Sequence, residues 1–274
     1  MKFDPLEHPV CLDLPIWLEE TAWAGHLPFG MFLISTMQPR VYVELGVDRG
    51  TSYSALCQAV VQTGAETRCF GIDTWQGDEH AGSRTDDVLA RLREHHDPRY
   101  SSFSKLHRST FDAALPEFPD GSIDLLHIDG FHTYDAVRHD YETWLPKMSD
   151  RGIVLFHDTT VRDRDFGVWK FWSEVSSGRP HFEFAHSNGL GVLSVGDYIA
   201  DGLQPFFDCK EEEHALIRQF FEAVGGRCEA LVQNRHQREK IDELYDYAAL
   251  VKDSWLLSSY HKARRGFGRT YRGE

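Results

Sequence analysis

Cysteine is scarce in this chain of 274 residues, and the few that occur lack a functional spacing. None forms a C-x-x-C pair, and the five are scattered along the chain as Cys11, Cys57, Cys69, Cys209 and Cys228. An odd and scattered set argues against a disulfide framework and against a zinc knuckle. A reducing compartment is the simpler interpretation, so we expect a cytoplasmic protein.

Long apolar runs and positive charge are also scarce. No stretch reaches the ~18 apolar residues of a membrane-spanning helix, and the first eight residues lack the apolar core of a signal peptide. Lys and Arg number 29 against 43 Asp and Glu, which gives a formal net charge of −14. Because nucleic-acid binding needs a basic surface, we expect neither a nucleic-acid partner nor a membrane span.

What the sequence does contain is an alternation of short apolar runs and amphipathic segments. The runs predict strands at 41–46, 68–73, 105–107, 123–129 and 153–157, and a closing hairpin within 182–195. Helices are predicted at 51–61, 134–145 and 166–175, with one more inside the long polar connection 74–103. This order predicts an α/β fold with a doubly wound, mostly parallel seven-stranded sheet.

The flanks of this sheet predict two helical additions. Residues 12–37 show helical apolar spacing, so residues 1–40 are predicted to form an N-terminal helical cap before a core of 41–197. Residues 198–274 are predicted to form a C-terminal helical extension. Its apolar stripe consists of Ile241, Leu244, Ala248, Val251 and Trp255. Such a stripe packs on the core or pairs with a second copy, which leaves a homo-oligomer through these helices open.

Two carboxylates close two adjacent predicted strands. Asp129 follows the run that begins at Ile123, and Asp158 follows the run 153–157. Ligands of open α/β sheets bind outside the carboxyl ends of the strands, so both acids are expected at one mouth. Together with His132 and His157 they can hold a divalent metal and supply a base. The alternative interpretation is two polar strand ends with helix-capping Asp residues.

The first two strand ends predict a nucleoside pocket. Gly46 and Gly50 allow a sharp turn and a close approach to a ligand, but the G-x-G-x-x-G fingerprint is absent. Glu44 precedes this turn, and Asp73 is placed to bind ribose hydroxyls. Acids without a phosphate cradle favour a positively charged nucleoside, which fits S-adenosyl-L-methionine. Further cofactor contacts are predicted from Thr51, Ser52, Thr74 and Ser109.

These segments resemble a known family over roughly residues 15–196. Val43-Glu-Leu-Gly-Val-Asp-Arg-Gly-Thr-Ser and Phe70-Gly-Ile-Asp-Thr-Trp resemble the first two motifs of class I S-adenosylmethionine-dependent methyltransferases. More narrowly, Leu126-His-Ile-Asp-Gly-Phe-His-Thr-Tyr-Asp, with Asp140-Tyr-Glu-Thr-Trp and Val154-Leu-Phe-His-Asp, resembles a subgroup often joined to glycosyltransferases. That subgroup is similar to metal-dependent sugar O-methyltransferases of macrolide biosynthesis and to cephalosporin hydroxylase-like proteins.

The resemblance implies an O-methyltransferase that acts, with metal assistance, on a sugar or glycan hydroxyl of a surface polysaccharide or a glycosylated natural product. It implies Mg or Mn held by Asp129 and Asp158, and a general base at His132. The third ligand position carries His157, where those enzymes carry an acid. This departure favours a softer metal or frees His157 from the metal, because imidazole is a poor magnesium ligand.

Other polar residues are expected to be buried, solvent-exposed or in contact with the acceptor. His127 is expected to be a satisfied buried histidine, and Asp140, with its neighbours on the helix 134–145, a solvated surface residue. Trp75, His80 and Arg84 in the 74–103 connection are candidates for acceptor contact.

Two competing functions stay open at this point. One is a metal-dependent oxygenase or hydrolase that uses Asp129, His132, His157 and Asp158, and the other is a non-catalytic assembly domain of a polysaccharide pathway.

Overall fold

The computed structural model describes residues 3–78, 82–208 and 210–267, and the side chains of these residues up to 251 with the exception of residue 78. The chain forms two compact units, Met1–Ala230 and Leu231–Glu274. The predicted division at residues 40 and 197 stays a prediction.

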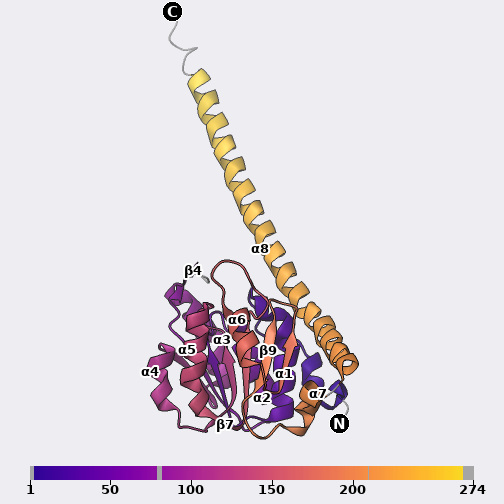
Figure 1. Cartoon of the computed structure of the whole chain (residues 1–274). Helices are drawn as coiled ribbons and strands as arrows, with labels where there is room; N and C mark the ends of the chain where they lie inside the picture. The colour runs from indigo at the N-terminus through magenta and orange to yellow at the C-terminus, as the bar shows by residue number, and fades with distance from the viewer. Residues whose placement is uncertain (1–2, 79–81, 209, 268–274) are drawn as a thin grey trace, which may run out of the picture. The chain divides into compact units, whose positions relative to one another are not determined.

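The first unit is built on a seven-stranded sheet flanked by helices (Figure 1). Its strand order is β5-β2-β1-β6-β7-β9-β8. Its strands are β1 (Val41–Leu45), β2 (Arg68–Asp73), β5 (Ser104–Arg108), β6 (Ile123–Ile128), β7 (Met148–His157), β8 (His181–Phe184) and β9 (Leu190–Ser194). The first five strands in this order are parallel, and β9 runs antiparallel to both β7 and β8. The predicted α/β sheet, with its antiparallel hairpin at one edge, is confirmed.

Helices cover both faces of this sheet because its central strands are apolar on both sides. Val43 on β1 belongs to a core cluster shared with α5 (Tyr134–Trp144) and α6 (Val168–Val175). Tyr42, which points the opposite way, stacks on Tyr53 of α2 (Thr51–Thr63) with ring centroids 5.9 Å apart. The strand alternation therefore assigns α2 to one face and α5 with α6 to the other.

The N-terminal segment differs from its prediction. Only α1 (Leu27–Met37) is an α-helix, preceded by the 3₁₀ turns η1 (Pro5–Glu7), η2 (Pro9–Leu12) and η3 (Ala22–His26). Residues 13–21 form no helix. The Gln58 side chain accepts from the Ile16 N–H at 2.8 Å and donates to the Leu14 carbonyl at 3.1 Å. These backbone groups bind a side chain of α2 instead of each other, so apolar spacing alone misled the prediction.

The long connection after β2 contains more structure than its polar sequence predicted. Two short strands, β3 (Gly77–Asp78) and β4 (Gly82–Ser83), pair with each other, and α3 (Asp86–Tyr100) follows them. The expected helix near residues 88–92 is thereby confirmed, whereas the small sheet and α4 (Phe111–Ala114) were not predicted. His80 lies outside the described residues.

After β9 the chain is helical, with η6 (Asp201–Leu203), α7 (Gln204–Asp208) and the long α8 (Glu211–Phe267). The part of α8 in the first unit buries Ile217, Phe221 and Cys228. In the second unit, Ile241 and Leu244 of the predicted stripe are 50% and 66% exposed. Among the described residues no helix is long and apolar enough to cross a membrane.

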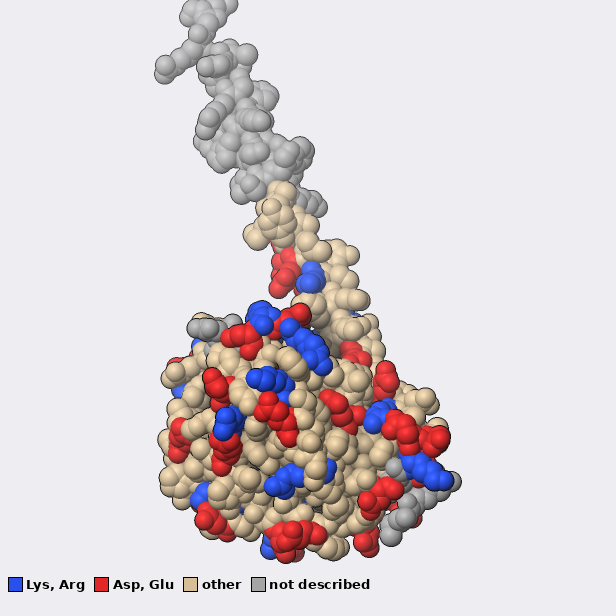
Figure 2. Space-filling model, viewed as in Figure 1, with Lys and Arg blue, Asp and Glu red and all other residues tan. Residues whose placement is uncertain are grey.

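Acidic and basic side chains are mixed over the face drawn in Figure 2. The excess of acids is spread over this face and does not gather into one patch.

Candidate active site

A cavity of about 580 Å³ lies at the carboxyl ends of β1, β2, β6 and β7. Because these strands are parallel, their ends meet at one edge of the sheet, which is where open α/β folds bind ligands. The predicted site residues that line it are Gly46, Gly50, Thr51, Ser52, Asp73, Thr74, Asp129, His132, His157 and Asp158.

The turn after β1 forms one wall and depends on two glycines. Gly46 and Gly50 have φ angles of 92° and 77°, in the left-handed region that favours glycine. A Cβ at Gly46 would also collide with the carbonyl oxygen of Asp129. The turn and the end of β6 therefore touch backbone to backbone.

Asp73 holds this turn in place. Its carboxylate accepts from the N–H groups of Val47 at 2.9 Å, Asp48 at 2.8 Å and Trp75 at 2.6 Å. Burial raises the pKa of Asp73, although these N–H groups act against the shift. Its Oδ2 carries two of the three donors, so Oδ1 keeps one lone pair for a ligand hydroxyl.

Glu44 lies beneath the cavity and is not among its described lining residues. The carboxylate is fully buried, and it accepts from the hydroxyls of Tyr42 and of Ser52, the latter at 2.7 Å. His127 is buried as expected, and its Nε2 accepts from the Trp23 indole at 3.0 Å. Its Nδ1 lies 3.1 Å from a Glu44 oxygen but makes no hydrogen bond among the described residues, so this histidine is only partly satisfied. The structure thus gives Glu44 a supporting place behind Ser52.

Ser109 is likewise absent from the described lining, whereas its neighbour Thr110 contributes to it. The backbone of Ser109 donates to the Asp73 carbonyl at 2.9 Å and continues the pairing of β2 with β5.

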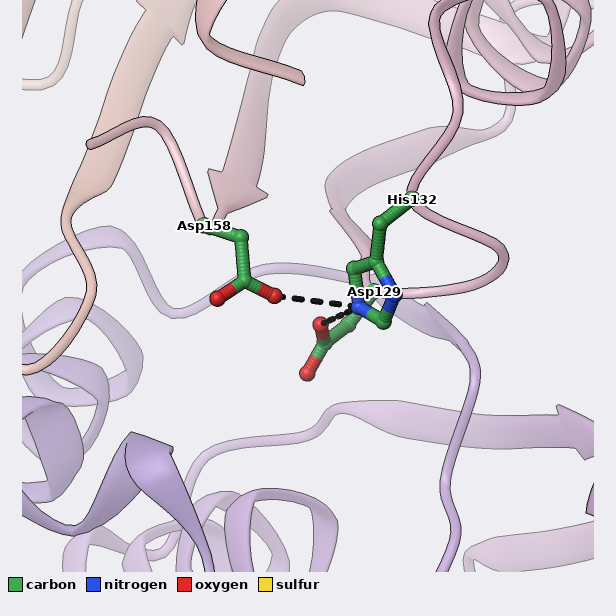
Figure 3. A group of neighbouring side chains, drawn as sticks. All are labelled: Asp129, His132 and Asp158. Carbon is green, nitrogen blue, oxygen red and sulfur yellow. Dashed lines mark ion pairs between the residues drawn. The ribbon is translucent and has the colours of Figure 1, made fainter. Parts of the chain in front are cut away.

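The two predicted acids and two histidines meet at the other wall, and Figure 3 shows Asp129, His132 and Asp158 of this group. The Nε2 atom of His132 lies 3.0 Å from Asp158 Oδ2 and 3.6 Å from Asp129 Oδ1. The Nδ1 atom of His157 lies 3.2 Å from Asp129 Oδ1 and 3.3 Å from Asp158 Oδ2. We call these four residues the acid–imidazole cluster.

The acids and imidazoles of the cluster strongly shift one another's pKa values. Burial would raise the pKa of Asp129 and of Asp158, but the imidazoles, His157 first, hold both well below their usual range. Burial would lower the pKa of His132, but its hydrogen bonds to the two acids raise it to about 9. The same acids raise the pKa of His157 against its burial. At neutral pH the cluster by itself therefore pairs two imidazolium ions with two carboxylates, and His132 must lose its proton before it can act as a base.

The same atoms fit a divalent cation. Donor atoms of Asp129, His132 and Asp158 all lie within 4.8 Å of one another. His157 Nε2 lies 3.2 Å from the Ser187 carbonyl and donates to it, so the lone pair of a neutral ring would be on Nδ1 and face both acids. Metal-binding histidines commonly use their second nitrogen in this way. Two carboxylates with imidazole suit Mn, Fe or Zn better than Mg.

Several residues that sequence reasoning missed complete the cavity. Phe166 stacks on His132 with ring centroids 4.7 Å apart and an interplanar angle of 7°. The Asn188 amide donates to Asp158 Oδ1 at 2.9 Å. Both residues line the cavity. The sequence predicts Phe166 only as the start of a helix and Asn188 only as part of a hairpin, so no signal beyond turn chemistry points to them.

An N-terminal segment, residues 13–22, forms a further part of the wall through Glu20, Thr21 and Ala22. It is held by the Trp17 indole, which donates to the Arg49 carbonyl at 2.8 Å, and by Thr51, whose hydroxyl accepts from the Glu19 N–H at 3.0 Å. We call residues 13–22 the N-terminal strap.

Two of the residues predicted to contact the acceptor also lie at the cavity. Trp75 and Arg84 line the cavity, and both contact Asp48: the indole donates to its carbonyl at 2.8 Å and the guanidinium to its carboxylate at 2.6 Å.

Asp140 was expected on a solvated face, and this was wrong. It is buried where α5 passes Gly130, and burial raises its pKa to about 7.

Residues 43–159, which include most of this site, match the family model described as a methyltransferase domain. The chain is 47% identical over 251 residues to an uncharacterized protein, y4gI, of Sinorhizobium fredii. That alignment covers 91% of this chain and 27% of the relative, so the chain spans about a quarter of the relative's length.

Solved structures of methyltransferases also superpose on the chain. A methyltransferase from Geobacter sulfurreducens is 17% identical, with 65% of this chain and 80% of that one covered and a TM-score of 0.46. The O-methyltransferase TomG from Streptomyces achromogenes, in complex with SAM, is 14% identical, with 70% and 88% covered and a TM-score of 0.46.

Proposed function

We propose, on the premise that residues 43–159 are a methyltransferase domain of the S-adenosylmethionine-dependent class, that this chain methylates a hydroxyl group on a sugar or glycan. The observation that carries the proposal is that one cavity is lined both by the Gly46–Gly50 turn and by the acid–imidazole cluster. A donor at the turn and an acceptor at the cluster would meet within it. Alignment of the two reacting atoms is the main demand of such a displacement.

The charges of the lining suit the donor. Its acids are Glu20, Asp48, Asp73, Asp129 and Asp158. Arg49 lies 3.8 Å from Glu20, Arg84 lies 2.6 Å from Asp48, and the imidazoles of His132 and His157 pair with Asp129 and Asp158, so the lining keeps only a small excess of negative charge, at Asp73. S-adenosylmethionine carries a sulfonium and an ammonium, which this excess favours. The free lone pair of Asp73 is the expected partner for a ribose hydroxyl.

The acid–imidazole cluster would prepare the acceptor. A divalent cation, when bound, lowers the pKa of a coordinated hydroxyl and orients it. Asp129 and Asp158 would hold the cation, with His157 Nδ1 as a third donor. His132, once neutral, would accept the hydroxyl proton at Nε2 and share it with Asp158, 3.0 Å away.

A sugar or glycan as acceptor is supported by the segments around Asp129, Asp140 and Asp158 that resemble the sugar O-methyltransferases. A surface polysaccharide or a glycosylated natural product would present such a hydroxyl.

Calorimetry and a transfer screen test the proposal. The chain should bind S-adenosylmethionine and release S-adenosylhomocysteine in the presence of nucleotide sugars, free glycosides or oligosaccharides. EDTA should abolish release, and Mn²⁺ or Mg²⁺ should restore it. Absence of S-adenosylmethionine binding, with and without added metal, would refute the proposed function, whereas full transfer after exhaustive chelation would refute only the metal.

A further inference from the structure

Two residues that line the cavity and contact the acid–imidazole cluster, Phe166 and Asn188, lie outside the matched segment 43–159. Phe166 is on the segment that joins β7 to α6, and Asn188 is in the turn between β8 and β9. Each touches a different member of the cluster, Phe166 the ring of His132 and Asn188 the carboxylate of Asp158. Neither contact is a consequence of the parallel strands that bring the cluster together.

The backbone around Phe166 is fixed to the segment that carries His132. Thr133 and Phe166 form an antiparallel bridge, and the Gly167 N–H donates to the His132 carbonyl at 2.8 Å. A Cβ at Gly167 would collide with Tyr134, so the two segments are as close as glycine allows. The Phe166 ring therefore lies on a fixed base, parallel to the imidazole.

The backbone around Asn188 is fixed to the end of β7 in the same manner. The Asp158 N–H donates to the Gly189 carbonyl at 3.1 Å, and the Thr160 N–H donates to the Asn188 carbonyl at 3.0 Å. These bonds extend the β7–β9 ladder beyond its last paired residues, His157 and Leu190. The amide of Asn188 thus reaches Asp158 from a rigid turn.

Each contact removes one rotational freedom of the cluster. An imidazole turns about its outer side-chain torsion, which is broad, and a parallel ring on one face restricts that turn. A carboxylate can present either oxygen, but an amide on Oδ1 leaves Oδ2 toward His132 Nε2. Misplacement of a reacting group by about 1 Å can cost on the order of 10²-fold in rate.

We propose that Phe166 and Asn188 are positioning residues, which hold the His132 ring and the Asp158 carboxylate in the orientation needed for proton transfer. The inference rests on the proposed function and extends it to parts of the chain beyond residue 159.

The first test needs no acceptor. The ring protons of His132, identified in the NMR spectrum by their loss in His132→Gln, should be shifted upfield by the Phe166 ring. Phe166→Leu should move these signals downfield, whereas Phe166→Tyr should retain the upfield shift. Phe103 is a half-buried aromatic residue outside the described cavity lining, so Phe103→Leu should leave the His132 signals unchanged. Identical His132 signals in wild type and Phe166→Leu would overturn the stacking role.

The second test is kinetic. Phe166→Leu and Asn188→Gly should each lower kcat by about 10–100-fold, while KM for S-adenosylmethionine and Tm stay near the wild-type values. Glycine suits position 188 because Asn188 has a φ of 68°, so only the amide is lost. Gln38→Gly, at a left-handed position with φ of 42° away from the cavity, is the matched control. Asn188→Asp, which puts an acid against Asp158, should be slower still.

The outcomes separate the two proposals. Wild-type transfer together with unchanged kcat in Phe166→Leu and Asn188→Gly would refute the positioning roles and leave the function standing. A loss of kcat that follows a loss of Tm would also refute them, because it would show a merely structural role. Absence of S-adenosylmethionine binding by the wild type would refute the proposed function, and this inference with it.

Discussion

At the scale of single residues, burial gives Asp140 a pH dependence that an exposed acid would not have. Burial raises its folded pKa to about 7, whereas the unfolded value is about 3.9. The folded state therefore binds the extra proton between these values, and the free energy of unfolding falls as pH rises from about 4 to 7. Each unit of raised pKa costs about 1.4 kcal/mol above this window.

Asp140→Asn should remove this penalty, because an amide cannot ionise. Denaturant unfolding at pH 8 should show the variant at least about 1 kcal/mol more stable than wild type, with little or no gain near pH 4. Asp135→Asn, on the exposed side of the same helix, is the control and should give no gain at pH 8. An equal gain at both pH values would contradict the assignment.

Gly46 should be irreplaceable for two reasons that a paired variant can separate. Alanine there meets both a φ of 92° and the Asp129 carbonyl, whereas alanine at Gly64 meets only a φ of 68° with open space around it. Gly64→Ala should cost about 1 kcal/mol in the free energy of unfolding. Gly46→Ala should cost clearly more and should abolish calorimetric binding of S-adenosylmethionine. Equal costs would show that the close approach is relieved without consequence.

At the scale of elements, the N-terminal strap depends on α2 for its shape. The Gln58 side chain forms hydrogen bonds with the backbone of Leu14 and Ile16, and the N-terminal strap in turn places Glu20 at the cavity wall. A segment without its own helical or sheet bonds keeps its shape only through such contacts.

Gln58→Met should therefore loosen the strap without unfolding the sheet. Hydrogen exchange at the Ile16 amide should accelerate, and S-adenosylmethionine should bind roughly 10-fold more weakly, the result of losing about 1.4 kcal/mol. Thr63→Val is the control, because the hydrogen bonds of the Thr63 hydroxyl to described residues lie within α2. Unchanged exchange at Ile16 would show that other contacts suffice to hold the strap.

At the scale of the whole molecule, the division into two units predicts what the first unit does alone. The last turns of α8 before Ala230 bury Phe221 and Cys228, whereas most apolar side chains described beyond it, such as Leu244, are exposed. A chain that ends a few residues after Ala230 should keep its Tm and its affinity for S-adenosylmethionine. A large loss of either quantity would show that the second unit supports the site.

The strands and the cluster could be predicted because they follow from local patterns. A buried parallel strand is a short apolar run, and an acid that ends it must lie at the ligand edge, as Asp73, Asp129 and Asp158 do. The strap, Phe166 and Asn188 could not be predicted in this way. Their positions depend on long-range contacts of irregular backbone, which leave no period in the sequence.

The backbone contact between Gly46 and Asp129 also has a thermodynamic consequence. The Gly46–Gly50 turn is the predicted binding site of S-adenosylmethionine, and the end of β6 at Asp129 is part of the predicted cation site. Because the two segments share this contact, neither can shift without the other. Their occupancies should then be linked, and linkage is reciprocal: the factor by which Mn²⁺ changes the Kd of S-adenosylmethionine must equal the factor by which S-adenosylmethionine changes the Kd of Mn²⁺. Calorimetry in both orders measures this factor, and a value of one would mean that the two ligands bind independently across the shared backbone.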